Sequence, residues 1–297
     1  MKVLITGSES FLGHFLKIKL KKNKIKYYGI DQVKNKETKK CNILSKKLVK
    51  NIENKTTSII HLAAISSSKD FEKNPEKAFD VNVKGTINLL KAASQNNVRQ
   101  IIFASTEWVY GEESKKKINE KSAIDISSLG SEYAVSKYMC EQLIKYYCKI
   151  FRIKYVILRF GIIYGPRLNA SNWSAVETLI NKLLLKEKKI VVGSKKTARR
   201  FIHAEDVADA IIKSIEYKKS NVFNLSFDRL ISLGEIVETA SNILKLNVGL
   251  IEKNKNNFNF RNTDNTFIKK ILKWKPKKNL KNSTSEIIAS LKKINLN

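Results

Sequence analysis

The chain has little cysteine, proline or glycine and no long apolar run, and each shortage excludes a class of protein. Its 297 residues include 3 Cys, 3 Pro and 11 Gly. So few Pro and Gly residues argue against disordered linkers. Cys41, Cys140 and Cys148 lack metal-ligand spacing, so we expect no metal site, and they fit a reducing cytoplasm. No apolar run approaches the roughly 18 residues of a membrane helix. The first apolar run, VLI, is too short for a signal peptide.

Acidic residues are also scarce, since 27 Asp and Glu stand against 57 Lys and Arg, a net charge of +30. A nucleic-acid site would gather this charge on one face beside stacking aromatic side chains. Lysines instead run from Lys2 to Lys293, and most aromatics lie among apolar neighbours. We therefore expect charge spread over solvated faces, an attraction for an anionic substrate, and no nucleic-acid or membrane partner.

Strand-like and helix-like apolar patterns alternate along the first half of the chain. We predict strands at 2–6, 26–31, 58–63, 100–105 and 154–160, and helices at 11–22, 75–97 and 131–150. This alternation is typical of an α/β fold, a Rossmann-type doubly wound parallel sheet with helices on both faces. We assign 1–167 to a dinucleotide-binding Rossmann domain, to which the chain returns near 203–227. We assign 168–297 to a smaller, mixed region that mainly binds substrate.

The predicted helix at 75–97 carries two separate apolar stripes at 100° per residue. One holds Ala78, Val81, Gly85, Leu89 and Ala92, and the other holds Phe79, Val83, Ile87 and Leu90. Two stripes indicate burial on two sides. The second side meets either more of the same chain or a partner subunit. We expect a homodimer formed by this helix and the one at 131–150.

The sequence TGSESFLG follows the first predicted strand and opens the first helix, where a dinucleotide-binding protein places its glycine-rich loop. Gly7 and Gly13 fit the first and third glycines, but Ser10 fills the middle place. We expect Ser10 to lie against a pyrophosphate with a backbone that needs no glycine. Asp31 ends the second strand, where a carboxylate accepts hydrogen bonds from the adenosine ribose and repels a 2′-phosphate. Asp31 therefore favours NAD over NADP as the cofactor.

Tyr133 and Lys137 are four residues apart on a predicted helix, so they share one face. A neighbouring ammonium lowers the pKa of a phenol, which would suit Tyr133 as a general acid or base. With so many lysines, the spacing alone is weak evidence. Its place shortly after a strand that ends in FASTEWVYG is more informative, because open α/β sheets perform chemistry at the carboxyl ends of their strands.

From Met1 to about Leu291 the chain resembles the extended short-chain dehydrogenases/reductases, the NAD-dependent nucleotide-sugar epimerase/dehydratase family. The resemblance rests on segments in family order: TGSESFLG, IIHLAA, NVKGTINLLKAA, STEWVYG, YAVSK, LRFGIIYGPR, RRFIHAED and ILKWKP. It implies an enzyme that binds NAD and a nucleotide-diphosphate sugar. His61 and His203 are expected to make structural hydrogen bonds, and Cys140 to lie in the core.

The resemblance also assigns roles to individual residues. Tyr133 is the acid/base, Lys137 holds the nicotinamide ribose, Thr106 binds the reacting oxygen, and Glu107 is a further catalytic candidate. Asn42 stands where the family usually has Asp near the adenine, and Asn82 supports the active-site backbone. The implied cofactor-binding residues are Gly7, Ser10, Phe11, Leu12, Gly13, Asp31, Asn42, Ile43, Leu62, Ala63, Ala64, Asn82, Tyr133 and Lys137. The implied substrate-binding residues are Thr106, Arg167, Arg199, Trp173 and Arg261.

The resemblance leaves several reactions open, and we favour epimerisation at C4 through a transient 4-keto sugar. A 4,6-dehydratase would carry Asp and Glu after the Thr, where this chain has Glu107 and Trp108. Decarboxylases tend to have Glu at the place of Trp108, and a 4-keto reductase would usually prefer NADPH. Ile162 replaces an Asn that contacts the substrate phosphate in many epimerases. A dinucleotide sensor or nucleic-acid-binding protein on the same fold is the non-enzymatic alternative.

Overall fold

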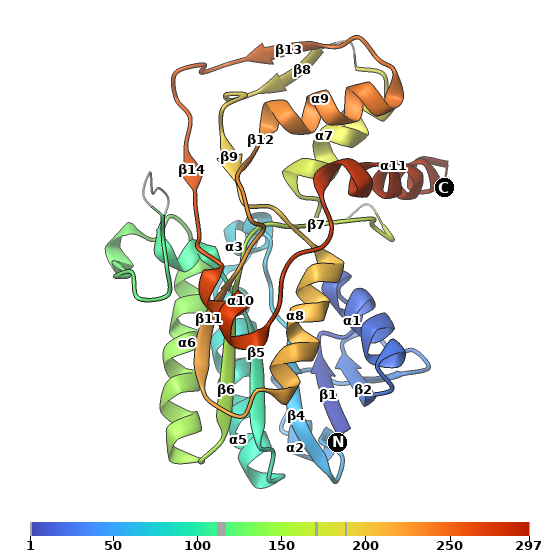
Figure 1. Ribbon diagram of the computed structural model, residues 1–297. Helices are drawn as coiled ribbons and strands as arrows, with labels where there is room; N and C mark the ends of the chain where they lie inside the picture. The colour runs from blue at the N-terminus through green and yellow to red at the C-terminus, as the bar shows by residue number, and fades with distance from the viewer. Residues whose placement is uncertain (1, 112–116, 170–171, 188, 297) are drawn as a thin grey trace.

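Seven parallel strands form the centre of the protein, in the order β11-β6-β5-β4-β1-β2-β3 (Figure 1). The computed structural model describes residues 2–111, 117–169, 172–187 and 189–296. The strands of this sheet are β1 (Lys2–Thr6), β2 (Lys26–Asp31), β3 (Thr38–Lys40), β4 (Thr56–His61), β5 (Gln100–Thr106), β6 (Lys154–Phe160) and β11 (Asn221–Leu225). The Rossmann-type sheet is confirmed. The chain leaves it after β6 and returns at β11, which pairs with β6.

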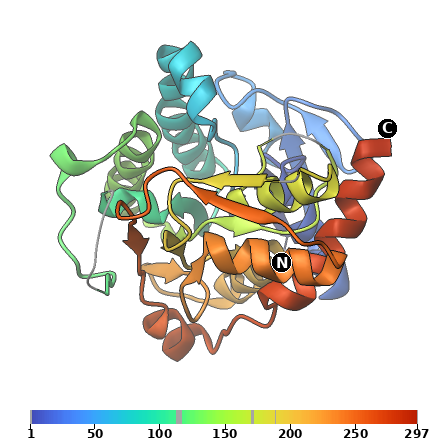
Figure 2. The same ribbon diagram turned by 90° about the horizontal axis from the view of Figure 1, so that it is seen from above.

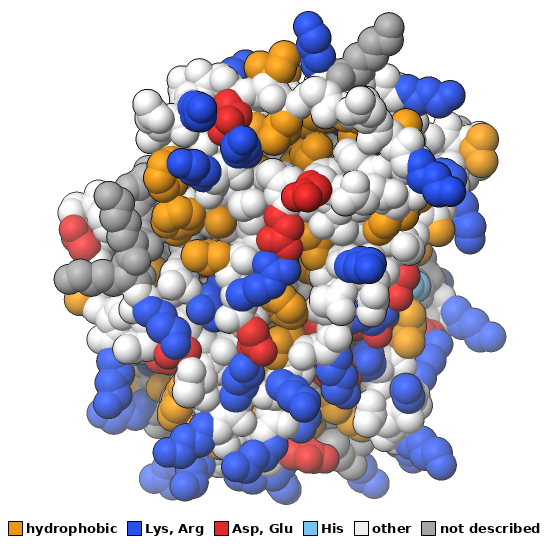
Figure 3. Space-filling model, turned by 45° about the horizontal axis from the view of Figure 1, so that its top comes forward, with side chains coloured by type: hydrophobic (Ala, Val, Ile, Leu, Met, Phe, Trp, Pro, Cys, Tyr) orange, Lys and Arg blue, Asp and Glu red, His pale blue; other side chains and the backbone are white. Residues whose placement is uncertain are grey.

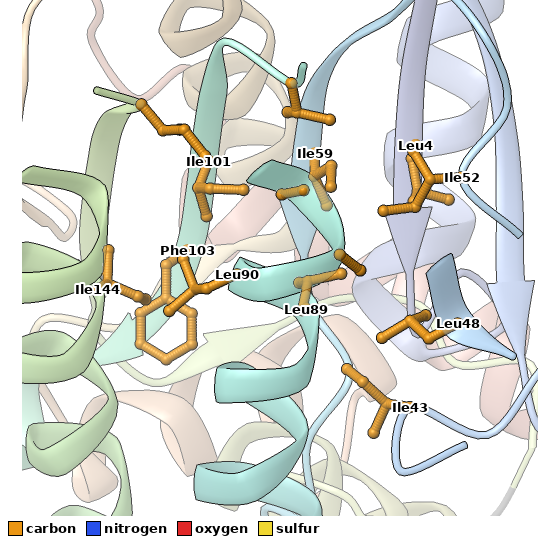
Figure 4. Close-up of a cluster of buried hydrophobic side chains, with 14 of the residues drawn as sticks. Leu4, Ile43, Leu48, Ile52, Ile59, Leu89, Leu90, Ile101, Phe103 and Ile144 are labelled. Atoms are coloured by element: carbon orange, nitrogen blue, oxygen red, sulfur yellow. The ribbon is translucent and has the colours of Figure 1, made fainter. Parts of the chain in front are cut away.

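Helices cover both faces of the sheet, and alternate strand residues face each layer. One layer contains α2 (Leu48–Asn51), α5 (Gly85–Gln95) and α6 (Glu132–Ile150), packed on strand residues such as Ile59 and Phe103. Figure 4 shows Leu89, Leu90 and Ile144 of these helices against the sheet. The other layer contains α1 (Phe11–Lys22), α8 (Ala204–Glu216) and α10 (Thr266–Leu272). The predicted helix boundaries at 11–22 and 131–150 agree with the structure to within one residue.

The predicted helix at 75–97 is continuous but not uniform. It consists of α4 (Pro75–Phe79), a π-helical turn, η1 (Asp80–Lys84), and α5. A π turn changes which residues share a face, so an analysis at a fixed 100° per residue does not hold across it. The first stripe is nevertheless buried, whereas Phe79, Val83 and Ile87 of the second are only partly buried. A short helix, α3 (Ser68–Lys73), precedes this segment and was not predicted.

The remaining segments form a smaller mixed region above the carboxyl edge of the sheet, as Figures 1 and 2 show. Its helices are α7 (Ala175–Leu184), α9 (Leu233–Leu244) and α11 (Leu280–Leu296). Its strands are β7 (Ile163–Tyr164), β8 (Lys189–Val192), β9 (Ala198–Arg199), β10 (Ile202–His203), β12 (Ile231–Ser232), β13 (Gly249–Glu252) and β14 (Phe260–Arg261). The three helices share one apolar cluster. Trp274, which follows α10, instead packs with the layer that contains α1, α8 and α10.

None of the described helices is both long and apolar enough to cross a lipid bilayer. Within the same residues, no three His, Cys, Asp or Glu side chains are grouped so that they could bind a metal ion.

Candidate active site

The strand order reverses between β1 and β4, and the loops after these strands open the crevice in which doubly wound folds bind dinucleotides. Two adjoining cavities, of about 380 and 400 Å³, lie there. Both are lined by Glu9, Ser10, Leu62 and Ala64, so they form one groove. Its two halves suit the two halves of a dinucleotide.

The backbone geometry of the glycine-rich loop explains why two of its three places hold glycine and the third holds serine. Gly7 has φ +70°, and a Cβ there would lie 2.6 Å from the backbone nitrogen of Ala63. A Cβ on Gly13 would lie 2.4 Å from the carbonyl oxygen of Ser8. Ser10 has φ −67° and caps α1, its hydroxyl accepting a hydrogen bond from the Gly13 N–H at 3.2 Å. The predicted backbone of Ser10 is thus confirmed, and Ser replaces Gly at the one place of the three that needs no glycine.

The adenine-side cavity is lined by seven predicted residues, namely Gly7, Ser10, Asp31, Ile43, Leu62, Ala63 and Ala64. The Asp31 carboxylate accepts hydrogen bonds from the N–H groups of Glu9 at 3.0 Å and Gln32 at 2.6 Å. Glu9 adds a second carboxylate at this rim, which the sequence did not single out. The Glu9 carboxylate pairs with Lys17 at 2.8 Å, so Asp31 is the carboxylate that disfavours a ribose 2′-phosphate. Asn42 is exposed, and its side-chain oxygen accepts from the Leu44 N–H at 2.9 Å; Cys41 and Ile43 line the cavity instead.

The other cavity brings Tyr133 and Lys137 of α6 beside Ser10, Phe11, Leu12 and Arg167. The Lys137 ammonium donates to the Ala104 carbonyl oxygen at 2.8 Å. Burial lowers the pKa of Lys137 to about 8, although Cys140 and Glu141 act in the opposite direction. Thr106, the last residue of β5, is buried and accepts from the Trp108 N–H at 3.2 Å.

The expected lowering of the Tyr133 pKa by Lys137 is wrong. Burial raises the pKa of Tyr133, the Cys140 thiol adds to this, and a hydrogen bond with Thr106 only partly offsets it. The Lys137 nitrogen lies 5.8 Å from the Tyr133 ring centroid and is directed to Ala104. The phenol is therefore protonated at neutral pH, and its proton must leave when substrate and cofactor are bound.

Asn82 joins the π turn to the loop after β4. Its side-chain oxygen accepts from the Ile65 N–H at 2.8 Å, and its amide donates to the Ile65 carbonyl at 2.9 Å and to Ser136 at 3.0 Å. Ile65 lines the adenine-side cavity and Ser136 precedes Lys137, so Asn82 holds both walls of the groove from below. It lies in neither cavity lining.

A buried ionic network that the sequence analysis missed fixes α6 to the sheet. Arg159 of β6 donates two hydrogen bonds to Glu141, at 2.9 and 2.6 Å, and Ser105 donates a third at 2.6 Å. Glu141 is one turn beyond Lys137, so α6 is tied to consecutive β5 residues, Ala104 and Ser105, immediately before Thr106. The four-residue spacing of Tyr133, Lys137 and Glu141 was the available signal.

Glu107 does not line either cavity. Its carboxylate is fully buried, accepts from the Thr263 hydroxyl at 3.0 Å, and lies near Arg199, Arg200 and Arg261. Burial raises its pKa to about 7 despite these arginines. Arg261 is also fully buried; it stacks on Trp108 at 3.7 Å and donates to the Gly111 carbonyl at 2.7 Å. These contacts form a seam that joins the turn after β5 to β14 and to Thr263 just beyond it.

The other predicted substrate ligands are positioned by the upper region. Arg199 of β9 donates to the Asn259 side chain at 2.6 Å. Arg167 lines the catalytic cavity, pairs with the buried Glu177 at 2.9 Å, and stacks on Phe11 at 3.6 Å. The Trp173 indole donates to the Asn169 carbonyl at 3.1 Å. Asn169 and Leu168 line the catalytic cavity, whereas Trp173 does not.

The two histidines and Cys140 occupy structural places. His61 is buried between the hydroxyls of Thr6, at 2.8 Å, and Thr86, at 3.0 Å. His203 is buried at the start of α8, and its Nδ1 accepts from the Glu205 N–H at 3.2 Å. Cys140 is 1 % exposed in the core. None of the three reaches the groove.

Comparison with known proteins identifies the family. A model of the NAD dependent epimerase/dehydratase family matches residues 3–226. The chain belongs to this family. It is an NAD-dependent nucleotide-sugar enzyme of the epimerase/dehydratase class, and the groove around Gly7, Ser10 and Asp31 fits its cofactor, NAD.

Relatives in the family differ in the reaction they are named for. A Methanocaldococcus jannaschii protein provisionally named a UDP-glucose 4-epimerase is 28% identical, over 99% of each chain. A dTDP-D-glucose 4,6-dehydratase of Dictyostelium discoideum is 29% identical, over 82% of this chain and 62% of its own. The crystal structure of Thermotoga maritima UDP-glucose 4-epimerase with UDP-glucose superposes with a TM-score of 0.89, at 23% identity and covering 100% of both chains. That structural likeness shows the shared fold.

Proposed function

We propose that the protein is an NAD-dependent epimerase of a nucleotide-diphosphate sugar, acting at C4 through a transient 4-keto sugar. The observation that carries this proposal is the placement of Tyr133, Lys137 and Thr106 at the carboxyl end of β5, beside a groove fitted to a dinucleotide. NAD supplies the acceptor and donor of hydride when it is bound. The roles below are those we assign to the chain's own residues.

Tyr133 first releases its own phenolic proton to solvent as substrate and cofactor bind. The phenolate oxygen then takes a proton from the sugar hydroxyl and later returns it. Thr106, hydrogen-bonded with Tyr133, orients the same hydroxyl. Lys137 binds the nicotinamide ribose. The Ala104 carbonyl and the Glu141–Arg159 pair hold Lys137 and α6 in this position.

Substrate binding falls to the upper region in this proposal, with 1–167 and the returning 203–227 as the cofactor domain. Arg199 contacts the diphosphate, because a guanidinium donates two parallel hydrogen bonds to phosphate. Arg167 lines the path towards the sugar, and Arg261 and Trp173 contribute from the seam and the loop before α7. UDP-sugars are the first substrates to test, given those that the relatives are named for.

Glu107 supports epimerisation over the dehydratase alternative. A 4,6-elimination needs an acid and a base at the sugar, and Trp108 cannot act as the second carboxylate. Glu107 is turned towards Thr263 and away from the cavity that contains Tyr133. A 4-keto reductase is disfavoured because the Asp31 carboxylate opposes the 2′-phosphate of NADPH.

The deciding experiment is to incubate the purified protein with UDP-, dTDP-, GDP- and CDP-sugars without added cofactor and to follow the products by NMR. The proposal expects an epimerised sugar and no net oxidation or reduction. A free 4-keto-6-deoxy sugar would assign the dehydratase activity instead, release of CO2 from a uronic acid sugar the decarboxylase, and a demand for NADPH the reductase.

We also propose a homodimer in the cytoplasm. Met139, Tyr146 and Ile150 of α6 are 42, 61 and 53% exposed and lie at positions that share one side of the helix. Val83 and Ile87 are partly buried and belong to η1 and α5, which both contact α6. Light scattering coupled to size-exclusion chromatography should give twice the 34.0 kDa mass of the chain. The double variant Tyr146→Glu with Ile150→Glu should give the mass of the monomer. The cytoplasmic location rests on three free, buried cysteines.

A further inference from the structure

A third cavity, of about 490 Å³, lies at the amino ends of β4, β5 and β6, at the opposite edge of the sheet from Tyr133. Its lining includes three cationic side chains, Arg99, Lys154 and Lys218, together with the ring of Tyr217. No carboxylate among the described residues lines it. Ligand pockets are typically about 300–1,000 Å³, so its size fits a small molecule.

The cations of this cavity are available to a ligand. Arg99 and Lys154 are exposed, and within the described part of the chain neither side chain forms an ion pair or hydrogen bond. Their backbones are fixed, because the Lys154 N–H donates to the Arg99 carbonyl at 2.9 Å and the Arg99 N–H to the Thr57 carbonyl at 3.0 Å. Arg99 and Lys154 therefore line the same cavity from fixed backbones at the start of two neighbouring strands.

The floor of the cavity does not oppose negative charge. Helix α8 ends there, and the carbonyl end of a helix would repel an anion. The buried Gln100 amide donates to the carbonyls of Ser214 at 2.9 Å and Tyr217 at 2.7 Å, and Lys218 donates to that of Ile215 at 3.4 Å. Because these carbonyls are already engaged, Arg99 and Lys154 determine the charge that the cavity prefers.

Helix ends alone do not explain this charge. Basic residues commonly occupy the last turn of a helix, but Lys154 is the first residue of β6 and Arg99 directly precedes β5. The neighbouring connections at this edge add Lys24, Lys55 and Arg152, all exposed. Figure 3, in which the upper region is tilted towards the viewer, shows that Lys and Arg side chains are scattered over that face as well. The surrounding charge draws anions in, and the cavity offers them a defined place.

We propose that this cavity binds a small phosphorylated molecule, with Arg99 and Lys154 as the phosphate ligands and Lys218 and Tyr217 as the wall. Arg99 donates to phosphate oxygens as a planar fork and Lys154 acts as a point charge beside it. The site is separated from the catalytic groove by the length of β4 and β5. It is independent of the reaction that the enzyme performs.

The test is calorimetric titration of inorganic pyrophosphate into the full-length protein at about 150 mM ionic strength, where long-range attraction is largely screened. Arg99→Gln with Lys154→Gln removes the two ligands. The matched control, Lys22→Gln with Lys24→Gln, removes the same charge from exposed positions at the same edge but outside the cavity. Melting curves of both variants establish that they are folded.

We expect the wild type to show a binding component that the Arg99/Lys154 variant weakens by at least about tenfold, since it loses two charged hydrogen-bond donors to phosphate. The control should change it by less than about twofold. Pyrophosphate that binds in the catalytic groove should bind both variants as it binds the wild type. A binding component that neither variant changes is therefore assigned to the groove. Equal weakening in both variants would mean general attraction to a basic surface and would overturn the proposal, as would no loss in either or no binding at all.

Discussion

The cofactor-binding sheet and the region above it are built in different ways. In the sheet, helices connect most strands to the next, although a loop joins β2 to β3, and six of the seven strands have five to seven residues in parallel pairing. In the upper region, β9 has two residues and pairs with β12 and β14, which come from distant parts of the chain. The first design repeats one local unit and fixes a catalytic edge. The second joins short distant segments, so its ligand contacts can differ while the sheet stays the same.

If chemistry belongs to the sheet, removing the Tyr133 hydroxyl should have the largest effect. We expect Tyr133→Phe to lower kcat by about 10²–10⁴-fold, the usual contribution of a general acid or base. NAD should remain bound, which absorbance of the cofactor released on denaturation would measure. Tyr146→Phe, on an exposed face of the same helix, serves as the control. Retained turnover in the Tyr133 variant would remove this residue from the mechanism.

Glu107 lies at the seam between the two regions and should make their association depend on pH. Its pKa of about 7 exceeds the 4.5 of a free Glu, so the folded protein binds the proton more tightly than the unfolded chain does. Its contribution to stability is complete below pH 4.5 and is lost as the pH rises to about 7. The loss should approach about 3 kcal/mol, because one pKa unit is 1.36 kcal/mol.

Glu107→Gln, which keeps an acceptor for Thr263, should therefore remove this part of the pH dependence. Urea unfolding at pH 5 and pH 8 measures it. Glu216→Gln changes an exposed carboxyl at the other edge of the sheet and should leave the difference between the two pH values unaltered. The same difference in wild type and Glu107→Gln would show that Glu107 is already ionised at pH 5.

The glycine-rich loop should distinguish a required glycine from a replaceable one. Gly7→Ala places a Cβ 2.6 Å from a backbone nitrogen at φ +70°, and we expect NAD affinity to fall by about 100-fold or more, equal to about 2.7 kcal/mol. Ser10→Gly removes a helix cap and should cost only a few tenths of a kcal/mol in stability. Fluorescence titration with NAD compares the two. Equal losses would contradict the assignment of Ser10 to a place without steric demand.

The smallest effect should come from the upper region and appear in KM. Arg199→Gln is expected to raise KM by about tenfold while kcat changes by less than threefold, as when a uniform binding contact is lost. Lys196→Gln, three residues away and exposed, is the control for charge. A fall in kcat as large as the rise in KM would mean that Arg199 acts in the transition state, and the division of labour between the regions would fail.

The alternating half of the chain was predictable because each of its elements has a local signal. The apolar periods located the strands and α1 and α6 closely. The ends of strands located the loop and Asp31, and the four-residue spacing located Tyr133 and Lys137, whose roles the family segments then assigned. Thr263 and Arg159 carry no such signal, since their roles arise from contacts between residues up to 156 positions apart. Asn42 lies between two residues that line the cavity, but its own side chain accepts a hydrogen bond from its loop and faces solvent. No periodicity in the sequence reveals that orientation.

The π turn at Asp80–Lys84 lies within one continuous helix and changes which residues share a face before and after it. A π turn accommodates one residue more than an α turn, so α4 and α5 are rotated relative to each other by about the angle of one residue. Shortening the turn by one residue would be sterically mild, yet it would rotate Ala78 out of the core or Asn82 away from Ile65. The number of residues in this turn, more than their identity, keeps the wall of the groove and the core aligned, so length variation should be tolerated less here than substitution.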